Sequence, residues 1–385
     1  MNLPLGFRYA ATYAGLRKVA KNDLALIAGD QACSAAALFT TNLVVAAPVI
    51  VARENLRKSR GRVRAWLINA GNANCATRTG RKVASACVSA TAKALGTKAN
   101  EILPASTGVI GVEMDAQKVV KALPGLVSAL SPDKFDEVAQ AILTTDTRPK
   151  TAFLETKGAR FAGLTKGSGM IHPNLATTLG FVMTDAVASP IDLREALRSA
   201  VERSFHRLSV DGDMSTNDTV SVMASGASGV KLSAQALKAA LTEVLQSLAM
   251  QIARDGEGAR KFVTIDVEGA ASEAAAERVA RAIANSPLVK TAIGGADPNW
   301  GRVIAAAGYA GVRFDPAKVD IDMQQVAVCR GGFAADFSEA DLTKKLGEPE
   351  CHIRFTIRGK GRGRARFWTC DLTEGYIQIN GSYRT

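Results

Sequence analysis

The sequence predicts an α/β protein, because segments with helical spacing alternate with segments that have the pattern of buried strands. Residues 179–183 form a short apolar run, and Val263, Ile265 and Val267 alternate with polar residues as in a strand buried on one face. Apolar residues recur at helical spacing in residues 82–95, 193–205 and 237–252. With 385 residues, the chain is long enough for two or three domains.

The longest apolar run comes early, at residues 43–52, and we interpret it as a buried strand although it contains Pro48. It is much shorter than the roughly 18 residues that a membrane span needs, so we expect no membrane association. The first residues lack a basic start followed by an apolar stretch, so no secretory signal is visible. We therefore expect a cytoplasmic protein.

A helix start is predicted at Ser189 and Pro190, where a capping residue precedes proline in the first turn and Asp192 lies near the positive end of the helix dipole. The helical pattern of residues 237–252 ends before Gly256 and Gly258, which signal a break. An Ala-rich helix near residues 269–290, followed by short strands, predicts a smaller C-terminal lobe from about residue 270.

The cysteines show no metal-binding or disulfide spacing. No pair has the CxxC arrangement, which argues against a zinc site and against a disulfide scaffold. Reduced thiols in a cytosolic enzyme are the simplest interpretation. The six positions are Cys33, Cys75, Cys87, Cys329, Cys351 and Cys370.

The net charge of +12 raises the question of a nucleic-acid partner. Basic residues concentrate at residues 53–64 and again at residues 354–366. Neither cluster is interleaved with aromatic side chains suited to base stacking, so we interpret both as solvated surface and expect no nucleic-acid partner. The role of the second cluster, in the predicted hairpin Arg358–Arg366, is left open.

A glycine-rich segment places Thr177 directly after Ala176, at the start of an apolar run. Gly167 and Gly169 allow the backbone to bend and to approach a ligand closely. If the chain were cut between Ala176 and Thr177, the threonine would carry both a hydroxyl and a free α-amine. Such an amine has a reference pKa of about 7.7–8.0 and can serve as the base for the hydroxyl. The alternative is an ordinary turn that leads into a core strand, and we assign the nearby His172 to the turn.

A second polar block imitates a calcium loop but lacks two of its requirements. Asp211, Asp213 and Ser215 have the right spacing, but Thr216 stands where glycine is needed and Val222 where a bidentate Glu is required. We therefore expect no metal in this loop. A GxSxG serine-hydrolase motif is also absent.

Residues 166–186 (KGSGMIHPNLATTLGFVMTDA) resemble the signature of the ornithine acetyltransferase, or glutamate N-acetyltransferase, family, whose members cleave themselves at an Ala–Thr bond. Further blocks match in family order, at residues 69–74, 105–111, 144–147, 211–218, 255–259, 295–302 and 380–385. The resemblance implies an α/β fold of the layered α+β sandwich type. Its αββα-like core would be related to autoproteolytic aminopeptidases, with a smaller α/β C-terminal lobe.

The resemblance also implies roles for individual residues. Thr177 would be the nucleophile, and Thr107 with Gly108 would hold the oxyanion. Lys166 would suit a substrate carboxylate and Glu257 an ammonium group. The substrate-binding positions that match are Thr144, Lys166, Thr177, Glu257, Asn380 and Thr385. Thr145 is an alternative to Thr144, because the segment between Thr144 and Lys166 is shorter than the family pattern.

The implied reaction is transfer of an acetyl group from N2-acetyl-L-ornithine to L-glutamate in arginine biosynthesis, through an acetyl-Thr177 intermediate. It would follow self-cleavage between Ala176 and Thr177 into chains 1–176 and 177–385, with two cleaved pairs associating. The resemblance implies no metal and no cofactor, and it leaves open whether acetyl-CoA is also a donor. The alternative is an autoproteolytic aminopeptidase or amidohydrolase that uses the same threonine, with water as the acceptor.

Overall fold

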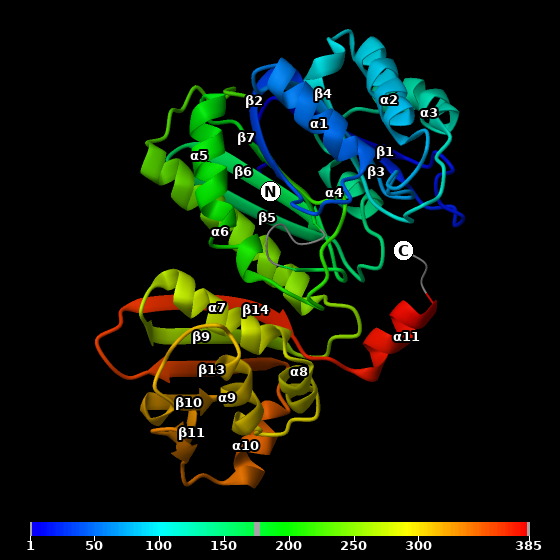
Figure 1. Cartoon of the computed structure of the whole chain (residues 1–385). Helices are drawn as coiled ribbons and strands as arrows, with labels where there is room; N and C mark the ends of the chain where they lie inside the picture. Colours follow the sequence, from blue (N-terminus) through cyan, green and yellow to red (C-terminus); the bar gives the residue numbers. More distant parts are fainter. Residues whose placement is uncertain (1, 173–177, 383–385) are drawn as a thin grey trace.

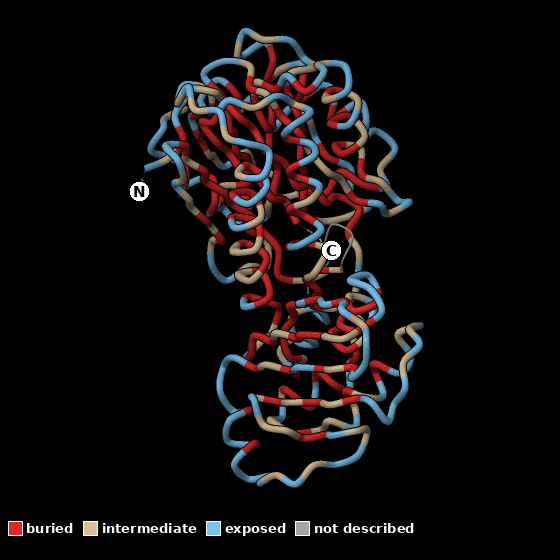
Figure 2. Tube along the Cα trace, turned by 90° about the vertical axis from the view of Figure 1, so that its left-hand side faces the viewer, coloured by how far each residue is buried: buried red, intermediate tan, exposed pale blue. Residues whose placement is uncertain are grey.

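The computed structural model describes residues 2–172 and 178–382, which form a larger and a smaller lobe (Figure 1). Their described strands make an eight-stranded sheet and a six-stranded sheet, respectively. Buried residues concentrate inside each lobe, as Figure 2 shows. The second sheet includes β9 (Phe262–Ala270), so the smaller lobe begins one strand before the boundary that we expected near residue 270.

The larger lobe contains eight described strands and six α-helices. The strands are β1 (Phe7–Thr12), β2 (Leu24–Phe39), β3 (Arg62–Asn69), β4 (Ile102–Ser106), β5 (Lys150–Thr156), β6 (Ala159–Lys166), β7 (Leu179–Thr184) and β8 (Thr219–Ala224). The helices are α1 (Ala47–Lys58), α2 (Gly80–Leu95), α3 (Ala116–Ser128), α4 (Phe135–Ala141), α5 (Pro190–Val201) and α6 (Ala234–Arg254). The strand order is β4-β3-β2-β8-β7-β6-β5, with β1 paired to β2.

The large sheet folds over itself at the long strand β2. Its pairing with β3 shifts register between Ala28 and Cys33, and beyond that shift β2 pairs with β8 on its other edge. Trp66 of β3 and Phe181 of β7 then meet with ring centroids 5.2 Å apart, although these strands are not neighbours in the sheet. The two parts of the sheet therefore face each other across a shared core.

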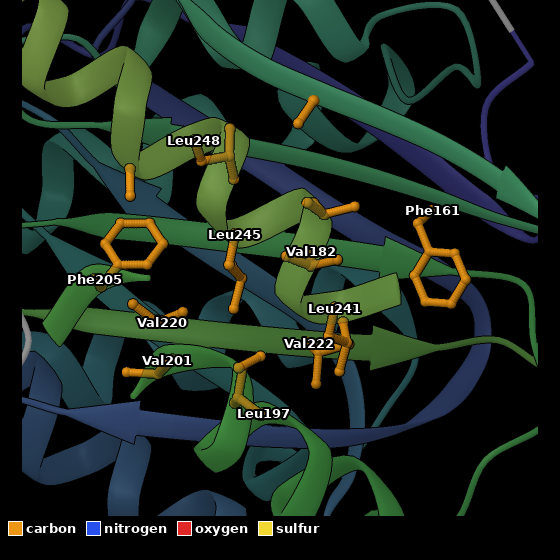
Figure 3. Packing of buried hydrophobic residues seen from close by; sticks show 14 of the residues in the cluster. Phe161, Val182, Leu197, Val201, Phe205, Val220, Val222, Leu241, Leu245 and Leu248 are labelled. Carbon is orange, nitrogen blue, oxygen red and sulfur yellow. The ribbon is translucent and has the colours of Figure 1, made fainter. Parts of the chain in front are cut away.

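Helices cover the outer side of each part. Residues of α2 and α3 pack on β2 and β3, whereas α5 and α6 lie on the other flank of the lobe (Figure 1). In Figure 3, Leu197 of α5 and Leu241 of α6 meet Val182 and Val222 of the central strands. The order helix, sheet, sheet, helix confirms the αββα arrangement implied by the family resemblance.

The predicted helix start at residue 190 is confirmed. The Ser189 hydroxyl accepts the Asp192 N–H at 3.2 Å, and the Asp192 carboxylate accepts the Ser189 N–H at 3.3 Å. This reciprocal cap satisfies N–H groups that the first turn leaves free. The helices predicted at residues 82–95 and 237–252 are confirmed as α2 and α6, and the strand at residues 263–267 as part of β9.

The prediction of a buried strand at residues 43–52 is wrong. Leu43 is 98% exposed, and the following residues form α1, with Pro48 in its first turn. Proline is well placed there, because an N–H at that position would have no partner within the helix. Val49 and Ala52, three residues apart, lie on the buried face of the helix.

The smaller lobe packs helices on one face of its sheet. Its other strands are β10 (Val319–Met323), β11 (Val326–Arg330), β12 (Phe333–Ala334), β13 (Glu350–Ile357) and β14 (Gly363–Cys370). Its helices are α7 (Glu273–Asn285), α8 (Pro287–Gly294), α9 (Trp300–Gly308) and α10 (Glu339–Leu346). The last helix, α11 (Glu374–Ser382), extends beside the larger lobe (Figure 1).

Alternate residues of the second sheet face opposite ways. Ile265 of β9 and Phe355 of β13 join the apolar core with α7. We call the other side the open face. It carries Asp266, Glu268, His352, Arg354, Arg364 and Arg366. The six cysteines are all buried and none forms a disulfide. Within the described ranges, no helix is long and apolar enough to cross a membrane.

Candidate active site

A pocket of about 220 Å³ lies where α11 meets the larger lobe. Its lining comes from the loop after β3, the turn after β4, the loop before β5, the end of β6 and the turn that follows it, the loop before β8, the residues after α6, and α11. Segments far apart in the sequence thus converge on one small polar cavity. The lining residues are Ala73, Thr107, Gly108, Ile110, Thr144, Thr145, Lys166, Gly169, Met170, Asp211, Asp213, Ser215, Thr216, Asn217, Glu257, Tyr376 and Asn380.

Most of the residues proposed from the sequence lie in this pocket: Thr107, Gly108, Thr144, Lys166, Glu257 and Asn380. Ala176, Thr177 and Thr385 lie outside the described residues. The neighbour of Thr177, Thr178, is described, and its N–H donates to the buried Asp218 carboxylate at 3.1 Å. The structure therefore brings six of the proposed residues together and holds Thr178 next to the loop that forms one wall.

Thr107 and Gly108 form a tight turn against the chain that follows β3. The Thr107 N–H donates to the Asn69 carbonyl oxygen at 2.8 Å. Gly108 has a φ of +130°, and a Cβ there would lie 2.7 Å from the backbone carbon of Gly71. Only glycine fits this position. Neither the Gly108 N–H nor the Thr107 hydroxyl is used in a hydrogen bond with another described residue, so both are free to donate to a ligand.

Lys166, at the end of β6, brings a buried cation to the pocket. It is only 4% exposed. Burial lowers its pKa, an effect that the carboxylates of Asp146 and Asp218 partly oppose. No described carboxylate lies close enough to form an ion pair with it. An anionic group that enters the pocket would therefore meet an unpaired, poorly solvated ammonium group.

A buried ion cluster supports the turn after β6. Lys150 forms ion pairs with both Asp146, at 2.6 Å, and Asp255. Asp146 also accepts the Gly167 N–H at 2.7 Å. Burial alone would raise the pKa of Asp146, but Lys150 and Lys166 outweigh it and hold that pKa below its ordinary value. The cluster thus ties the glycine-rich turn to the end of α6.

Glu257 fills the space that Gly169 leaves open. Its N–H donates to the Ser168 carbonyl oxygen at 2.8 Å, and its Oε2 accepts from Asn380 Nδ2 at 2.7 Å. A Cβ at Gly169 would lie 2.1 Å from the same Oε2. The carboxylate is therefore held between the turn after β6 and α11, so α11 forms a wall of the pocket.

The structure also bears on the alternative between Thr144 and Thr145. Both line the pocket. The Thr145 hydroxyl lies 2.8 Å from the Ser168 hydroxyl and is engaged there. The Thr144 N–H donates to Asp146 at 3.1 Å, while its hydroxyl makes no hydrogen bond to a described residue. Thr144 therefore offers the more available hydroxyl of the two.

Sequence reasoning assigned no role to several residues of the pocket. Tyr376 of α11 donates its hydroxyl to Asp211 at 3.2 Å, and Asp211 accepts the N–H groups of Met170 and Ile171 at 2.6 and 2.8 Å. The block at residues 211–218 matched the family pattern, and its density of polar residues was the available signal. His172, which we assigned to the turn, is half-buried and does not line the pocket.

The described part of the chain, residues 2–172 and 178–382, holds no group of three His, Cys, Asp or Glu side chains placed to bind a metal ion. The polar groups of the pocket are instead hydroxyls, a backbone N–H, one ammonium group, carboxylates and an amide. Such a set can bind a small zwitterionic molecule and can stabilise a developing negative charge on oxygen.

Known proteins resemble this chain along nearly its whole length. A model of the ArgJ family matches residues 8–385. The arginine biosynthesis bifunctional protein ArgJ of Chlorobaculum tepidum is 44% identical over 391 aligned residues, covering 99% of this chain and 96% of that protein. The protein of the same name from Thermus thermophilus is 45% identical over 387 residues, covering 100% of both. A crystal structure of the Bacillus halodurans ArgJ protein is 40% identical with a TM-score of 0.51, covering 53% of this chain and 98% of that one.

Proposed function

The chain belongs to the ArgJ family, and we propose that it transfers the acetyl group of N2-acetyl-L-ornithine to L-glutamate through an ester on Thr177. It is an acyltransferase of arginine biosynthesis, a glutamate N-acetyltransferase. The observation that supports the mechanism is the convergence of Thr107, Gly108, Lys166 and Glu257 on one pocket, beside the strand that follows Thr177.

The first step is maturation of the nucleophile. The Thr177 hydroxyl attacks the carbonyl carbon of Ala176, the peptide C–N bond breaks, and an ester joins the two residues while the Thr177 amine takes up the proton. Water then hydrolyses the ester to give a free carboxylate on Ala176 and a free hydroxyl on Thr177. The new α-amine can accept the proton of that hydroxyl in later attacks.

In the transfer step, the Thr177 hydroxyl attacks the acetyl carbonyl of N2-acetyl-L-ornithine. The developing oxyanion is stabilised by the Thr107 hydroxyl and the Gly108 N–H, each worth about 2.7–4 kcal/mol of barrier in comparable sites. The amine of ornithine leaves with a proton. The amine of glutamate then attacks the acetyl ester, which regenerates the Thr177 hydroxyl and gives N-acetyl-L-glutamate.

The charged groups of the pocket suit the two amino acids. Lys166 would bind the α-carboxylate, since it is a buried cation without a carboxylate partner among the described residues. Glu257 would accept the side-chain ammonium group of ornithine, with Asn380 orienting it. Thr144 and Thr385 would add neutral hydrogen bonds. A bound carboxylate would raise the reduced pKa of Lys166, because a negative charge nearby favours the ammonium form.

One comparison supports division into two chains. The solved Bacillus halodurans chain is almost fully covered by about half of this one, as a relative present in two pieces would be. In this structure the strands on either side of residue 177, β6 and β7, are hydrogen-bonded neighbours over Phe161–Lys166 and Leu179–Thr184. Pieces 1–176 and 177–385 would therefore remain associated, and we propose that two such pairs assemble.

Acetyl-CoA would serve as a second donor by the same route. Its thioester would acetylate Thr177, with the coenzyme A thiol as the leaving group in place of ornithine, and glutamate would again accept the acetyl group. The relatives from Chlorobaculum tepidum and Thermus thermophilus carry the word bifunctional in their names. Release of free thiol from acetyl-CoA, dependent on glutamate, is the measurement that decides this.

The test begins with the intact mass of the purified protein under denaturing conditions. We expect two fragments in place of the 40.4 kDa chain, the second beginning at Thr177. Thr177→Ala should abolish cleavage and turnover, and Thr177→Ser should retain part of both. Thr178→Val is the matched control, because the buried Thr178 hydroxyl has no hydrogen-bond partner among the described residues, so its loss should leave cleavage intact.

An uncleaved chain with full activity would contradict the mechanism. The acceptor is tested separately by measuring acetate released from N2-acetyl-L-ornithine with and without glutamate. A transferase should form N-acetyl-L-glutamate and little acetate. Acetate released at the same rate without glutamate would instead favour the amidohydrolase alternative.

A further inference from the structure

A second hollow, of about 400 Å³, lies on the larger lobe between α1 and α5. It shares no lining residue with the candidate active site. Its floor is the last part of β2, including Ala37 and Phe39, and its sides are formed by Leu56 of α1 and Ile191 of α5. The hollow is independent of the acyl-transfer chemistry proposed above.

One edge of β2 is unpaired where it borders this hollow. From Ser34 to Phe39, β2 pairs with β8 on one side. On its other side β3 begins only at Arg62, opposite Ser34, and the Ala35 N–H donates to the Gly61 carbonyl oxygen at 2.8 Å. Beyond this bond, no described strand continues that edge.

The unpaired edge presents main-chain hydrogen-bonding groups to the hollow. In an antiparallel strand, the N–H and C=O of alternate residues point to the same side. Since the Ala35 N–H points away from β8, the main-chain groups of Ala37 and Phe39 point the same way. Both residues line the hollow. Open edges of this kind accept an added strand.

Arginines surround the same edge. Arg53, Arg57, Arg60 and Arg194 all line the hollow, and none forms an ion pair with a described acidic side chain. The Arg53 guanidinium lies 5.6 Å from the centre of the Phe39 ring. Cationic residues commonly protect sheet edges from pairing. Four charges of one sign exclude basic strands but attract an acidic one.

The sides of the hollow are apolar. Ile191 is 59% exposed, and Leu56 and Pro190 lie on the same lining. An added strand presents its side chains alternately to opposite faces. A segment in which acidic and apolar residues alternate would therefore place carboxylates near the arginines and apolar groups near Leu56 and Ile191.

We propose that this hollow binds an extended acidic segment of a partner protein, which pairs with the free edge of β2 at Ala37 and Phe39. Main-chain hydrogen bonds would supply part of the affinity, and the arginines would select for acidic character. The site is a docking surface for protein and is separate from the pocket that holds the small-molecule substrates.

The test measures binding of a fluorescein-labelled heptapeptide of alternating glutamate and valine to the full-length protein by fluorescence anisotropy. We expect saturable binding that the double variant Arg57→Glu, Arg194→Glu weakens by about tenfold or more. Arg198→Glu is the matched control, because it changes the charge of the same helix α5 but does not line the hollow. Acetyl transfer should be unchanged in both variants.

A second peptide separates strand pairing from simple charge attraction. It has the same sequence with a methyl group on every backbone nitrogen, which removes the main-chain donors on both edges but keeps every charge. We expect it not to bind. Equal binding of both peptides would overturn the proposal, as would no binding of either. If inorganic pyrophosphate bound at the arginines while the unmodified peptide did not, the hollow would be a small-anion site and the proposal would be wrong.

Discussion

Two ion clusters of similar chemistry occupy opposite environments in this molecule. Beneath the pocket, the Lys150 side chain is fully buried between Asp146 and Asp255. On the open face of the smaller lobe, Asp266 pairs with Arg366, whose side chain is 59% exposed, and with His352. Water screens the second cluster and not the first. The same kinds of charge should therefore position a functional site in one lobe and contribute little in the other.

The largest effect should come from removing the buried cation. Lys150→Met leaves two buried carboxylates without their partner, so the free energy of unfolding should fall by about 3–5 kcal/mol. Arg366→Met breaks the exposed pair and should cost about 0–1 kcal/mol. Urea denaturation of both variants measures the difference. Equal losses would mean that burial does not distinguish the two clusters.

A second contrast compares threonines of the two lobes. Thr107→Val should lower kcat by about 10²–10³, because it removes one donor to the oxyanion and keeps the shape of the side chain. Thr356→Val, at a half-buried position of β13, makes the same change far from the pocket lining and should leave kcat unchanged. Steady-state kinetics of acetyl transfer decide this. A normal kcat for Thr107→Val would remove this residue from the mechanism.

A smaller effect is expected from glycines. Gly169→Ala would put a Cβ 2.1 Å from Glu257 Oε2 and displace that carboxylate, so kcat/KM should fall by about tenfold, mainly through KM. Gly308→Ala in α9 meets no atom within 4 Å and should leave kinetics unchanged while stabilising the helix slightly. If the two variants had the same KM, Glu257 would not contact the substrate.

The smallest effect concerns pH. Partial burial would raise the pKa of Asp266, but hydrogen bonds with His352 and Arg366 outweigh it and hold the pKa well below its ordinary value. A depressed carboxyl pKa contributes stability above the unfolded value of about 3.9 and loses it as the pH falls below that value. The small stability difference between wild type and Arg366→Met should thus be constant from about pH 5 to 7 and shrink below about pH 4. A difference that grew on acidification would contradict this assignment.

Local patterns predicted the elements whose signals lie within a few residues. Ser189, Pro190 and Asp192 predicted the start of α5 because a reciprocal cap spans only one turn. The run at residues 43–52 was misassigned because its length and hydrophobicity suit a strand as well as a helix. Only the position of Pro48, in the first turn, pointed to α1.

The pocket was predictable for a different reason. Thr107, Lys166 and Glu257 were identified through resemblance to a family, since no spacing rule links positions so far apart. The ion cluster beneath them had no such signal. Lys150 and Asp255 are 105 positions apart, and the sequence around each one predicts only an ordinary surface charge. Only the folded chain brings them together in one buried site.

The order of strands in the larger sheet has a consequence for how the gene could be divided. β7 and β8 belong to the segment 177–385, whereas β2 and β6 belong to the segment 1–176. In the sheet, β7 and β8 lie between the other two strands, with β8 hydrogen-bonded to β2 and β7 to β6. Each half thus supplies the sheet partners of the other. Two separate messages, for residues 1–176 and 177–385, should produce polypeptides that complement each other only when they are made in the same cell, as an obligate split protein.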